Sequence, residues 1–159
     1  MKAATLIAES SVLLFALSAT LLALCVSVDA QLPAEIPRVG FLGATDASTN
    51  AARMEAFRQG LHDLGYVEGK NIVIEYRWAQ GKVERLPDLV TELVHLKVHV
   101  IVTSGPAGNR TAKQATSTIP IVMAQDNDPV GSGFVVSLAR PGGNITGLSI
   151  VEPERFKYG

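Results

Sequence analysis

The sequence predicts an α/β fold: an open parallel sheet with helices on both faces. Short apolar segments rich in β-branched residues alternate along the chain with amphipathic segments of helical period, and the connecting loops are short. This order is typical of βαβ units, whose right-handed crossovers place successive strands in parallel. The strand segments are apolar without alternation, as expected for a sheet that is covered on both faces.

The first three elements are a strand, a helix and a second strand. Residues 38–43 (RVGFLG) form a short apolar run closed by glycine, which predicts a buried strand. Over residues 51–64 apolar side chains recur every three or four positions, which predicts a helix with one apolar face. Gly65 is expected to cap this helix at its C-terminus. Residues 72–78 (IVIEYRW) are rich in β-branched and aromatic side chains and predict the second strand.

The later elements continue the alternation. Residues 84–96 place their leucines and valines on one helical face, and residues 98–103 (VHVIVT) predict the third strand. A third helix is expected to end at Thr116, before a fourth strand over residues 120–124 (PIVMA). Two short elements complete the prediction, a helix over residues 134–139 and a strand over residues 145–150.

The N-terminal segment has the pattern of a secretory signal peptide over residues 1–30. Lys2 gives a positive start, residues 12–28 run almost without charge, and a small residue, Ala30, ends the segment at the expected cleavage point. The alternative is a retained membrane anchor, because an apolar run of about 18 residues is long enough to span a bilayer.

The only cysteine, Cys25, lies inside this apolar run. Its context resembles a bacterial lipoprotein box, but Leu24 stands where that box needs a small residue. We therefore favour a cysteine that is removed with the signal peptide over a lipid anchor. The remaining chain then has no cysteine and can enter an oxidising compartment without forming a disulfide.

The composition excludes several classes of protein. The chain has 159 residues, of which 47% are hydrophobic and 18% charged. Such a chain is not disordered, collagen-like or a disulfide-rich scaffold. We expect a linker over residues 31–37 and a single α/β lobe over residues 38–150. The formal net charge of -1 provides no electrostatic footprint for nucleic acid, so we expect no nucleic-acid partner.

Three loops are the places where a ligand is expected. In an open parallel sheet, ligands bind outside the carboxyl ends of the strands. The loops that follow strands one, three and four lie at residues 44–49, 104–109 and 125–128. A binding site is therefore expected to combine residues from these three segments.

The loop after strand three suits an anion. Gly105 allows close approach of a ligand to the backbone, and Pro106 suits the first position of a helix. The exposed amides of that first turn would bind a carboxylate or phosphate, and Ser104 adds a hydroxyl. The alternative is that Ser104 is an ordinary helix N-cap, which contributes about 1 kcal/mol without any ligand.

The loop after strand four suits a cation. Asp126, Asn127 and Asp128 are close in sequence, so an amino group or a metal ion could be held there. The alternative is a solvated turn before Pro129, and for a metal ion we favour that alternative. Upstream, the strand aromatics Tyr76 and Trp78 suit either stacking on a ligand or packing in the core.

Catalytic and cofactor motifs are absent from the sequence. It contains no phosphate-binding P-loop, no dinucleotide-binding glycine motif after strand one and no nucleophile elbow. His95 and His99 are four residues apart, but the predicted helix ends between them, so a zinc site is not expected. None of the three loops contains a histidine for a catalytic triad. The residues alone indicate a secreted α/β lobe that binds a small ligand and needs no cofactor.

Longer stretches of the sequence resemble the substrate-binding proteins of bacterial ABC transporters, in the tryptophan/tyrosine-type family. The similar stretches are residues 57–61 (FRQGL), 64–78 (LGYVEGKNIVIEYRW), 113–122 (KQATSTIPIV), 128–133 (DPVGSG) and 137–149 (SLARPGGNITGLS). They occur in the same order as in that family.

The resemblance implies a periplasmic binding protein of type I architecture, in which two Rossmann-like α/β lobes close over a small solute, often an amino acid. It implies a binding protein rather than an enzyme, with an ABC permease of the inner membrane as partner. In the family's pattern, the ligand contacts of the first lobe come from the loops after strands one, three and four. The corresponding residues here are Ala44, Thr45, Ser104, Gly105, Pro106, Ala107, Gln125, Asp126, Asn127 and Asp128.

The chain departs from the family's pattern within these loops. Gly108, Asn109 and Arg110 stand where the family often has small residues after Pro106, and residues 125–127 (QDN) are more polar than is usual.

The length is a further departure from the pattern. The family has a second lobe of similar size, and residues 151–159 resemble the start of the crossover to it. The resemblance therefore implies a protein truncated to its first lobe, with impaired solute binding. Two other interpretations stay open: a standalone flavodoxin-like or hydrolase-like enzyme, and a gene fragment without function.

Overall fold

A computed structural model describes residues 35–149 of the chain. The predicted signal peptide, Cys25, most of the predicted linker and the segment 151–159 lie outside the described residues. None of the helices between residues 35 and 149 is sufficiently long and apolar to cross a bilayer.

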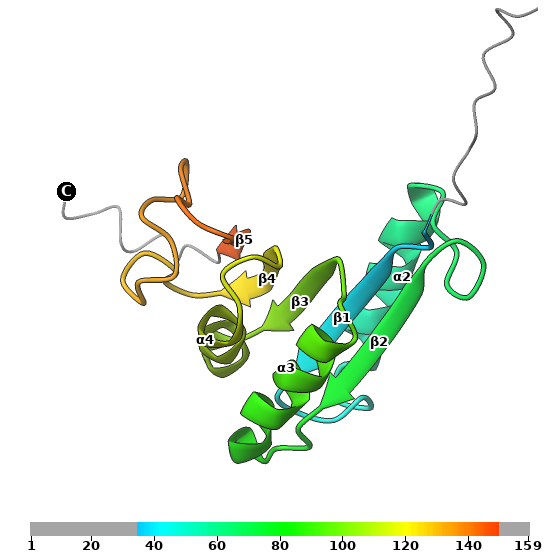
Figure 1. Ribbon diagram of the computed structural model, residues 1–159, viewed down its shortest axis with the longest axis horizontal. Coiled ribbons are helices and arrows are strands. Elements are labelled where there is room, and N and C mark those ends of the chain that lie inside the picture. The colour runs from blue at the N-terminus through cyan, green and yellow to red at the C-terminus, as the bar shows by residue number, and fades with distance from the viewer. Residues whose placement is uncertain (1–34, 150–159) are drawn as a thin grey trace, which may run out of the picture. The chain divides into compact units, whose positions relative to one another are not determined.

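Within these residues, five strands form one parallel sheet in the order β2-β1-β3-β4-β5 (Figure 1). The strands are β1 (Arg38–Gly43), β2 (Val73–Trp78), β3 (Val100–Ser104), β4 (Ile121–Asp126) and β5 (Ile145–Ser149). The connecting helical elements are α2 (Ala51–Asp63), the 3-10 turn η1 (Val83–Arg85), α3 (Leu86–His95) and α4 (Pro106–Ala115). The predicted open parallel sheet is confirmed.

Helices cover both faces of the sheet because alternate residues of each strand enter different cores. On one face, Met54 of α2 joins Phe41 of β1 in an apolar cluster. On the other face, Leu93 of α3 and Ala112 of α4 pack in a second cluster with Leu42, the next residue of β1. Complete burial of a side chain such as Leu93 contributes about 1.5–3 kcal/mol to stability.

Gly65 ends α2 as predicted. Its φ of +85 lies in the left-handed region that favours glycine. The N–H of Gly65 donates to the carbonyl of His62 (2.8 Å), and the N–H of Tyr66 donates to the carbonyl of Leu61 (2.9 Å). This pair of bonds is a Schellman motif, which satisfies carbonyls that the last helical turn would leave without partners.

The predicted helix over residues 134–139 is wrong, because this segment is irregular chain with bends. The N–H groups of Phe134 and Val135 both donate to the carbonyl of Pro129, at 2.9 and 3.2 Å. Lys113 Nζ of α4 donates to the carbonyls of Gly133 (2.6 Å) and Phe134 (2.9 Å). The carbonyl of Phe134, which a helix would use as an acceptor, is thus bound by Lys113. The N–H of Val136 donates to the later carbonyl of Pro141 (3.0 Å), opposite in direction to helical bonds, so contacts elsewhere in the fold decide this segment.

The fourth strand is longer than predicted. Residues 120–124 were expected, whereas β4 continues to Asp126, which pairs with Ser149 of β5 after an irregularity that begins at Met123. Pairing with β5 therefore draws Asp126 out of the expected loop and into the sheet.

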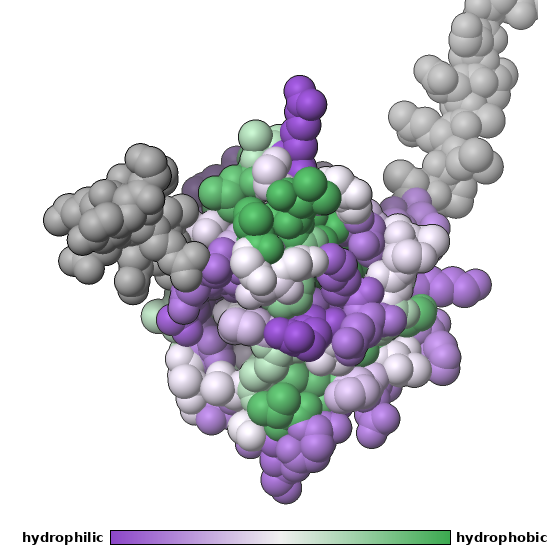
Figure 2. All heavy atoms as spheres, turned by 90° about the vertical axis from the view of Figure 1, so that its left-hand side faces the viewer, coloured by the Kyte–Doolittle hydropathy of each residue, from purple (hydrophilic) through white to green (hydrophobic). Residues whose placement is uncertain are grey.

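Apolar side chains stay exposed near β5 and the segment between β4 and β5. Val136, Leu138 and Leu148 are 77%, 58% and 70% exposed. Figure 2 views the molecule from this side and shows hydrophobic patches set among hydrophilic surface. Exposed apolar groups that gather on one part of a domain are typical of a contact surface.

We expect Gly147→Ala to destabilise the protein. A Cβ at this position would lie 2.1 Å from the carbonyl oxygen of Met123, and φ is +150. The expected loss in the free energy of unfolding is about 2 kcal/mol or more, measured by urea denaturation. The control is Gly60→Ala in the exposed part of α2, where a Cβ meets nothing within 4 Å. It should stabilise the protein by about 0.5–1 kcal/mol, and equal effects of the two substitutions would contradict the steric conflict expected at Gly147.

Candidate functional site

The register of the sheet brings the three predicted loops to one edge. Gly43 at the end of β1 pairs with Ser104 at the end of β3, and Thr103 pairs with Met123 of β4. The segments 44–45, 104–107 and 125–128 therefore follow three neighbouring strands at their carboxyl ends. This is the edge at which open parallel sheets bind ligands.

The loop after β1 is hydrogen-bonded to the segment that follows β2. The carbonyl of Ala44 accepts a bond from the N–H of Gly81 (2.8 Å), and the carbonyl of Thr45 accepts one from the N–H of Gln80 (3.3 Å). The exposed Thr45 accepts a bond at Oγ1 from Nδ2 of Asn50 (2.6 Å), so its own hydroxyl hydrogen can be donated to a ligand.

Asp46 orders the next turn of this loop. Its Oδ1 accepts bonds from the Ser48 hydroxyl (2.6 Å), the Thr49 N–H (2.7 Å) and the Thr49 hydroxyl (2.9 Å). These bonds, led by the one from Ser48, lower the pKa of Asp46 from 3.8 to about 2. The carboxylate is therefore ionised at every physiological pH.

The loop after β3 has hydrogen-bond donors without partners among residues 35–149. Gly105 is the N-cap residue of α4, with φ of +84, and the helix has no side-chain cap. The alternative that Ser104 is the N-cap is therefore wrong, since Ser104 ends β3 instead. Pro106 has no N–H, so the first-turn donors that point out of α4 are the amides of Ala107 and Gly108. Together with the Ser104 hydroxyl, they lie at the positive end of the helix dipole.

The loop after β4 divides into a buried and an exposed part. Asp126 is only 1% exposed, whereas Asn127 is exposed and Gln125 and Asp128 are half-buried. The Asp126 carboxylate accepts bonds from Asn109 Nδ2 (2.7 Å) and from the N–H of Asp128 (2.9 Å). Asp128 Oδ1 accepts the N–H of Gly131 (2.9 Å). The structure thus places the Asp126 carboxylate beneath the edge rather than on it.

Sequence reasoning missed two residues of this site, Gly108 and Asn109. Gly108 supplies a free amide, and Asn109 is fully buried and bonded to Asp126. The available signal was the departure of residues 108–110 from the family's small-residue run. That signal marked the position without indicating that the asparagine side chain points inward.

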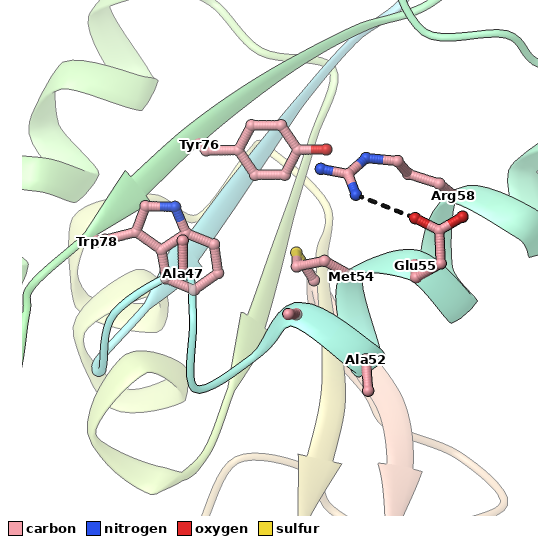
Figure 3. Close-up of a pocket in the computed structure, with 8 residues that line it drawn as sticks. Ala47, Ala52, Met54, Glu55, Arg58, Tyr76 and Trp78 are labelled. Carbon is pink, nitrogen blue, oxygen red and sulfur yellow. Dashed lines mark hydrogen bonds and ion pairs between the residues drawn. The ribbon is translucent and has the colours of Figure 1, made fainter.

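A groove lies beside this edge, between α2 and β2 (Figure 3). Its volume is about 600 Å³. The rings of Tyr76 and Trp78 stack at 6.3 Å, and the Arg58 guanidinium lies 5.6 Å from the Tyr76 ring. The lining residues are Ala47, Ala51, Ala52, Met54, Glu55, Arg58, Tyr76 and Trp78. Tyr76 and Trp78 also pack on the α2-side core, so the core interpretation of these aromatics is confirmed.

Charges at the groove are paired with one another. Arg58 binds Glu55 (3.4 Å) and Glu68 (3.2 Å). Burial is the main cause that raises the pKa of Tyr76, and the Glu68 carboxylate raises it further. The hydrogen bond to Tyr76 is the main cause that raises the pKa of Arg58. The guanidinium of Arg58 therefore already has two carboxylate partners that offset its charge.

No metal-binding group is found among residues 35–149, where no three histidine, cysteine or acidic side chains gather. His95 ends α3, and His99 lies outside that helix. His99 Nδ1 accepts the backbone N–H of Arg38 (3.0 Å), which ties the starts of β1 and β3.

The sequence is similar to known binding proteins. A family profile described as ABC transporter substrate binding protein matches residues 44–155. A tyrosine-binding protein of Clostridioides difficile is 36% identical over 95 residues, which cover 60% of this chain and 28% of that protein.

The fold is similar to three solved structures. A conserved domain protein of Vibrio cholerae gives a TM-score of 0.70 at 32% identity, covering 75% of this chain and 40% of that one. The ligand-free, open form of a substrate-binding protein with adhesive properties from Clostridium difficile gives 0.70 at 26%, covering 76% and 41%. An ABC domain in complex with L-Trp from Streptococcus pneumonia gives 0.66 at 25%, covering 71% and 38%. The chain thus spans less than half the length of these relatives.

We expect the Asp46 carboxylate to stabilise the loop after β1 only while it is ionised. Its pKa of about 2 in the folded protein is below the ordinary 3.8, so its contribution is complete above about pH 4 and is lost as the pH falls through about 2. Thermal unfolding of the parent protein and of Asp46→Ala, measured from pH 6 to pH 2, should show a difference in Tm that shrinks with acidity. A difference that is constant over this range would contradict the assignment.

Proposed function

The chain belongs to the family of ABC transporter substrate-binding proteins, and we propose that it forms a lobe that binds an amino acid at the edge where β1, β3 and β4 end. The observation that carries this proposal is the set of free donors at the start of α4. Family members are solute-binding proteins rather than enzymes. The proposed function therefore requires hydrogen-bonding groups for a solute at this edge and no catalytic residues.

The start of α4 suits the carboxylate of an amino acid. The Ser104 hydroxyl and the amides of Ala107 and Gly108 are donors, and the helix dipole favours a negative charge there. Gly105 and Pro106 shape the turn from which these donors project. One relative is a tyrosine-binding protein and another was solved with L-Trp, and both of these ligands carry such a carboxylate.

The neighbouring loops suit the rest of the solute. The half-buried Asp128 lies in the segment after β4 and provides a carboxylate for an ammonium group. Ala44 and the Thr45 hydroxyl follow β1, the strand that pairs with β3. Gln125 and Asn127, in the segment after Met123, provide side-chain amides. In this proposal Asp126 supports the contact from beneath, because its carboxylate is buried and already bonded.

Closure over the solute requires a second surface. We propose that the described lobe supplies one wall of the site and that a second lobe supplies the other, as in a hinged clamshell. The proposal is supported by the greater length of the relatives and by the exposed Val136 and Leu138. One wall leaves much of a solute in water, so the described lobe by itself is expected to bind weakly.

The cellular role follows from the family. Substrate-binding proteins of ABC transporters act outside the cytoplasm together with a membrane permease. We propose that residues 1–30 direct export to the periplasm and that the closed, loaded form is presented to an ABC permease of the inner membrane.

We expect L-tyrosine or L-tryptophan to shift the backbone amide signals of Ala107 and Gly108 in an NMR titration of the full chain. Ser104→Ala should raise the Kd by about 2- to 10-fold, which corresponds to the loss of one neutral hydrogen bond. Thr91→Ala is the control, because this exposed hydroxyl lies within α3 and bonds to the carbonyl of Pro87.

Two results would contradict the proposal. One is the absence of shifts at Ala107 and Gly108 at high concentrations of both amino acids. The other is conversion of the amino acid to a product by the purified protein, which would favour the enzymatic alternative.

A further inference from the structure

Three polar side chains are fully buried beneath the edge where β3 and β4 end. Thr103 of β3, Asn109 of α4 and Asp126 of β4 are 0%, 0% and 1% exposed. The Thr103 hydroxyl donates to Asn109 Oδ1 (2.5 Å), and Asn109 Nδ2 donates to Asp126 Oδ2 (2.7 Å). Asp126 Oδ1 then accepts the N–H of Asp128 (2.9 Å). These bonds run without a break from β3 through α4 to the loop after β4.

The bonds leave little freedom to the Asn109 side chain. The Asn109 carbonyl oxygen accepts from the Thr103 hydroxyl, and its nitrogen donates to the Asp126 carboxylate. If the amide were rotated by half a turn, its oxygen would face the Asp126 carboxylate, and two acceptors would repel each other. Within residues 35–149 no cation forms an ion pair with Asp126. The buried carboxylate therefore depends on Asn109 and on the N–H of Asp128, and an unmatched carboxylate in such a place is costly.

A second contact connects the same two loops. The N–H of Gly105 donates to the carbonyl of Gln125 (3.2 Å), and Asn109 Nδ2 also approaches this carbonyl, at 3.5 Å. Ala107 and Gly108 follow this contact in the loop after β3, and Asp128 follows it in the loop after β4. The bond between Asn109 and Asp126 therefore joins the segment that holds the α4 donors to the segment that holds Asp128.

We propose that Asn109 and Asp126 are a positioning pair that fixes the spacing between the loops after β3 and β4 and thereby sets the affinity for solute. The pair does not touch the solute, because both side chains are buried. The inference rests on the proposed solute-binding function. It adds that affinity depends on a bond beneath the site as well as on the groups that line it.

The test reverses the polarity of the pair. Asn109→Asp replaces the amide donor with a second carboxyl group at hydrogen-bond distance from Asp126 in a buried place. At neutral pH either the two carboxylates repel each other or one must take up a proton at a cost in free energy, so the contact between the loops should weaken. Adding Asp126→Asn restores the three short bonds: the new amide donates to the new carboxylate, still accepts from Asp128, and Thr103 still donates to position 109. Only the 3.5 Å approach of position 109 to the Gln125 carbonyl is lost, because a carboxylate cannot donate. Asn109→Asp should therefore be damaging, and the double variant Asn109→Asp/Asp126→Asn should be close to the parent protein.

Amide hydrogen exchange of the full chain without solute is the first measurement. In Asn109→Asp the amides of Gly105 and Asp128 should exchange about tenfold faster or more, the change expected on losing a charged hydrogen bond. The amide of Val102 at the centre of β3 should change by less than about twofold if the sheet itself stays intact. The double variant should return Gly105 and Asp128 to the parent rates.

Solute affinity is the second measurement, with L-tyrosine and L-tryptophan as probes. Asn109→Asp should raise the Kd about tenfold, and the double variant should restore it. Asn144→Asp is the matched control, because Asn144 donates to the carbonyls of Thr116 (3.0 Å) and Ile119 (2.9 Å) near the opposite ends of the strands. It should alter stability while leaving exchange at Gly105 unchanged.

The outcomes separate this inference from the proposed function. Unchanged exchange at Gly105 and Asp128, a uniform rise throughout the sheet, or faster local exchange without a change in Kd would each overturn the positioning pair. A failure of the parent protein to bind either amino acid would overturn the proposed function. The coupling of the two loops would then be decided by the exchange rates of the single and double variants, with faster local exchange that the double variant reverses supporting it.

Discussion

Parallel pairing of β1, β3 and β4 is the constraint on which the candidate site depends. With Gly43 opposite Ser104 and Thr103 opposite Met123, three neighbouring strands end at one edge of the sheet. The same register sends Leu42 into the core under α3 and α4 and leaves Phe41 for the core under α2. A shift of the β1 register by one residue would move each of its side chains to the opposite face of the sheet and remove these apolar side chains from their cores. The apolar cores therefore hold the polar loops in place.

Polar groups at this edge lie in two layers with different tasks. The upper layer, at the start of α4, has donors without partners in the described part of the chain, as a binding surface requires. The lower layer, formed by Thr103, Asn109 and Asp126, is buried and fully bonded. Buried polar groups are tolerated when every atom has a partner, and they then fix the geometry above them. When the donors of a binding site are already held in place, less conformational entropy is lost on binding.

The proposed site pairs groups of opposite polarity. Amide donors and a helix dipole lie on one side, and the carboxylate of Asp128 lies on the other, which matches the two ends of a zwitterion. The groove between α2 and β2 adds aromatic surface beside the loop after β1, including Trp78, the only tryptophan of the chain. Family membership and the relatives' ligands agree with the proposed amino-acid ligand.

The sequence by itself determined the parallel α/β sheet, nearly all of its elements, the cap at Gly65 and the three loops of the edge, because these depend on local periodicity, turn chemistry and strand order. Only the tertiary structure decided the rest. The segment 134–139 was predicted to be a helix, yet it is irregular because Lys113 binds the Phe134 carbonyl and the N–H of Val136 donates to Pro141. Asp126 was expected among the exposed residues of its loop and is buried, since pairing with β5 and the bond from Asn109 draw it inward. Asn109 and Asp126 are 17 residues apart in sequence, and no local pattern records a bond between side chains that meet only when β3, α4 and β4 pack together.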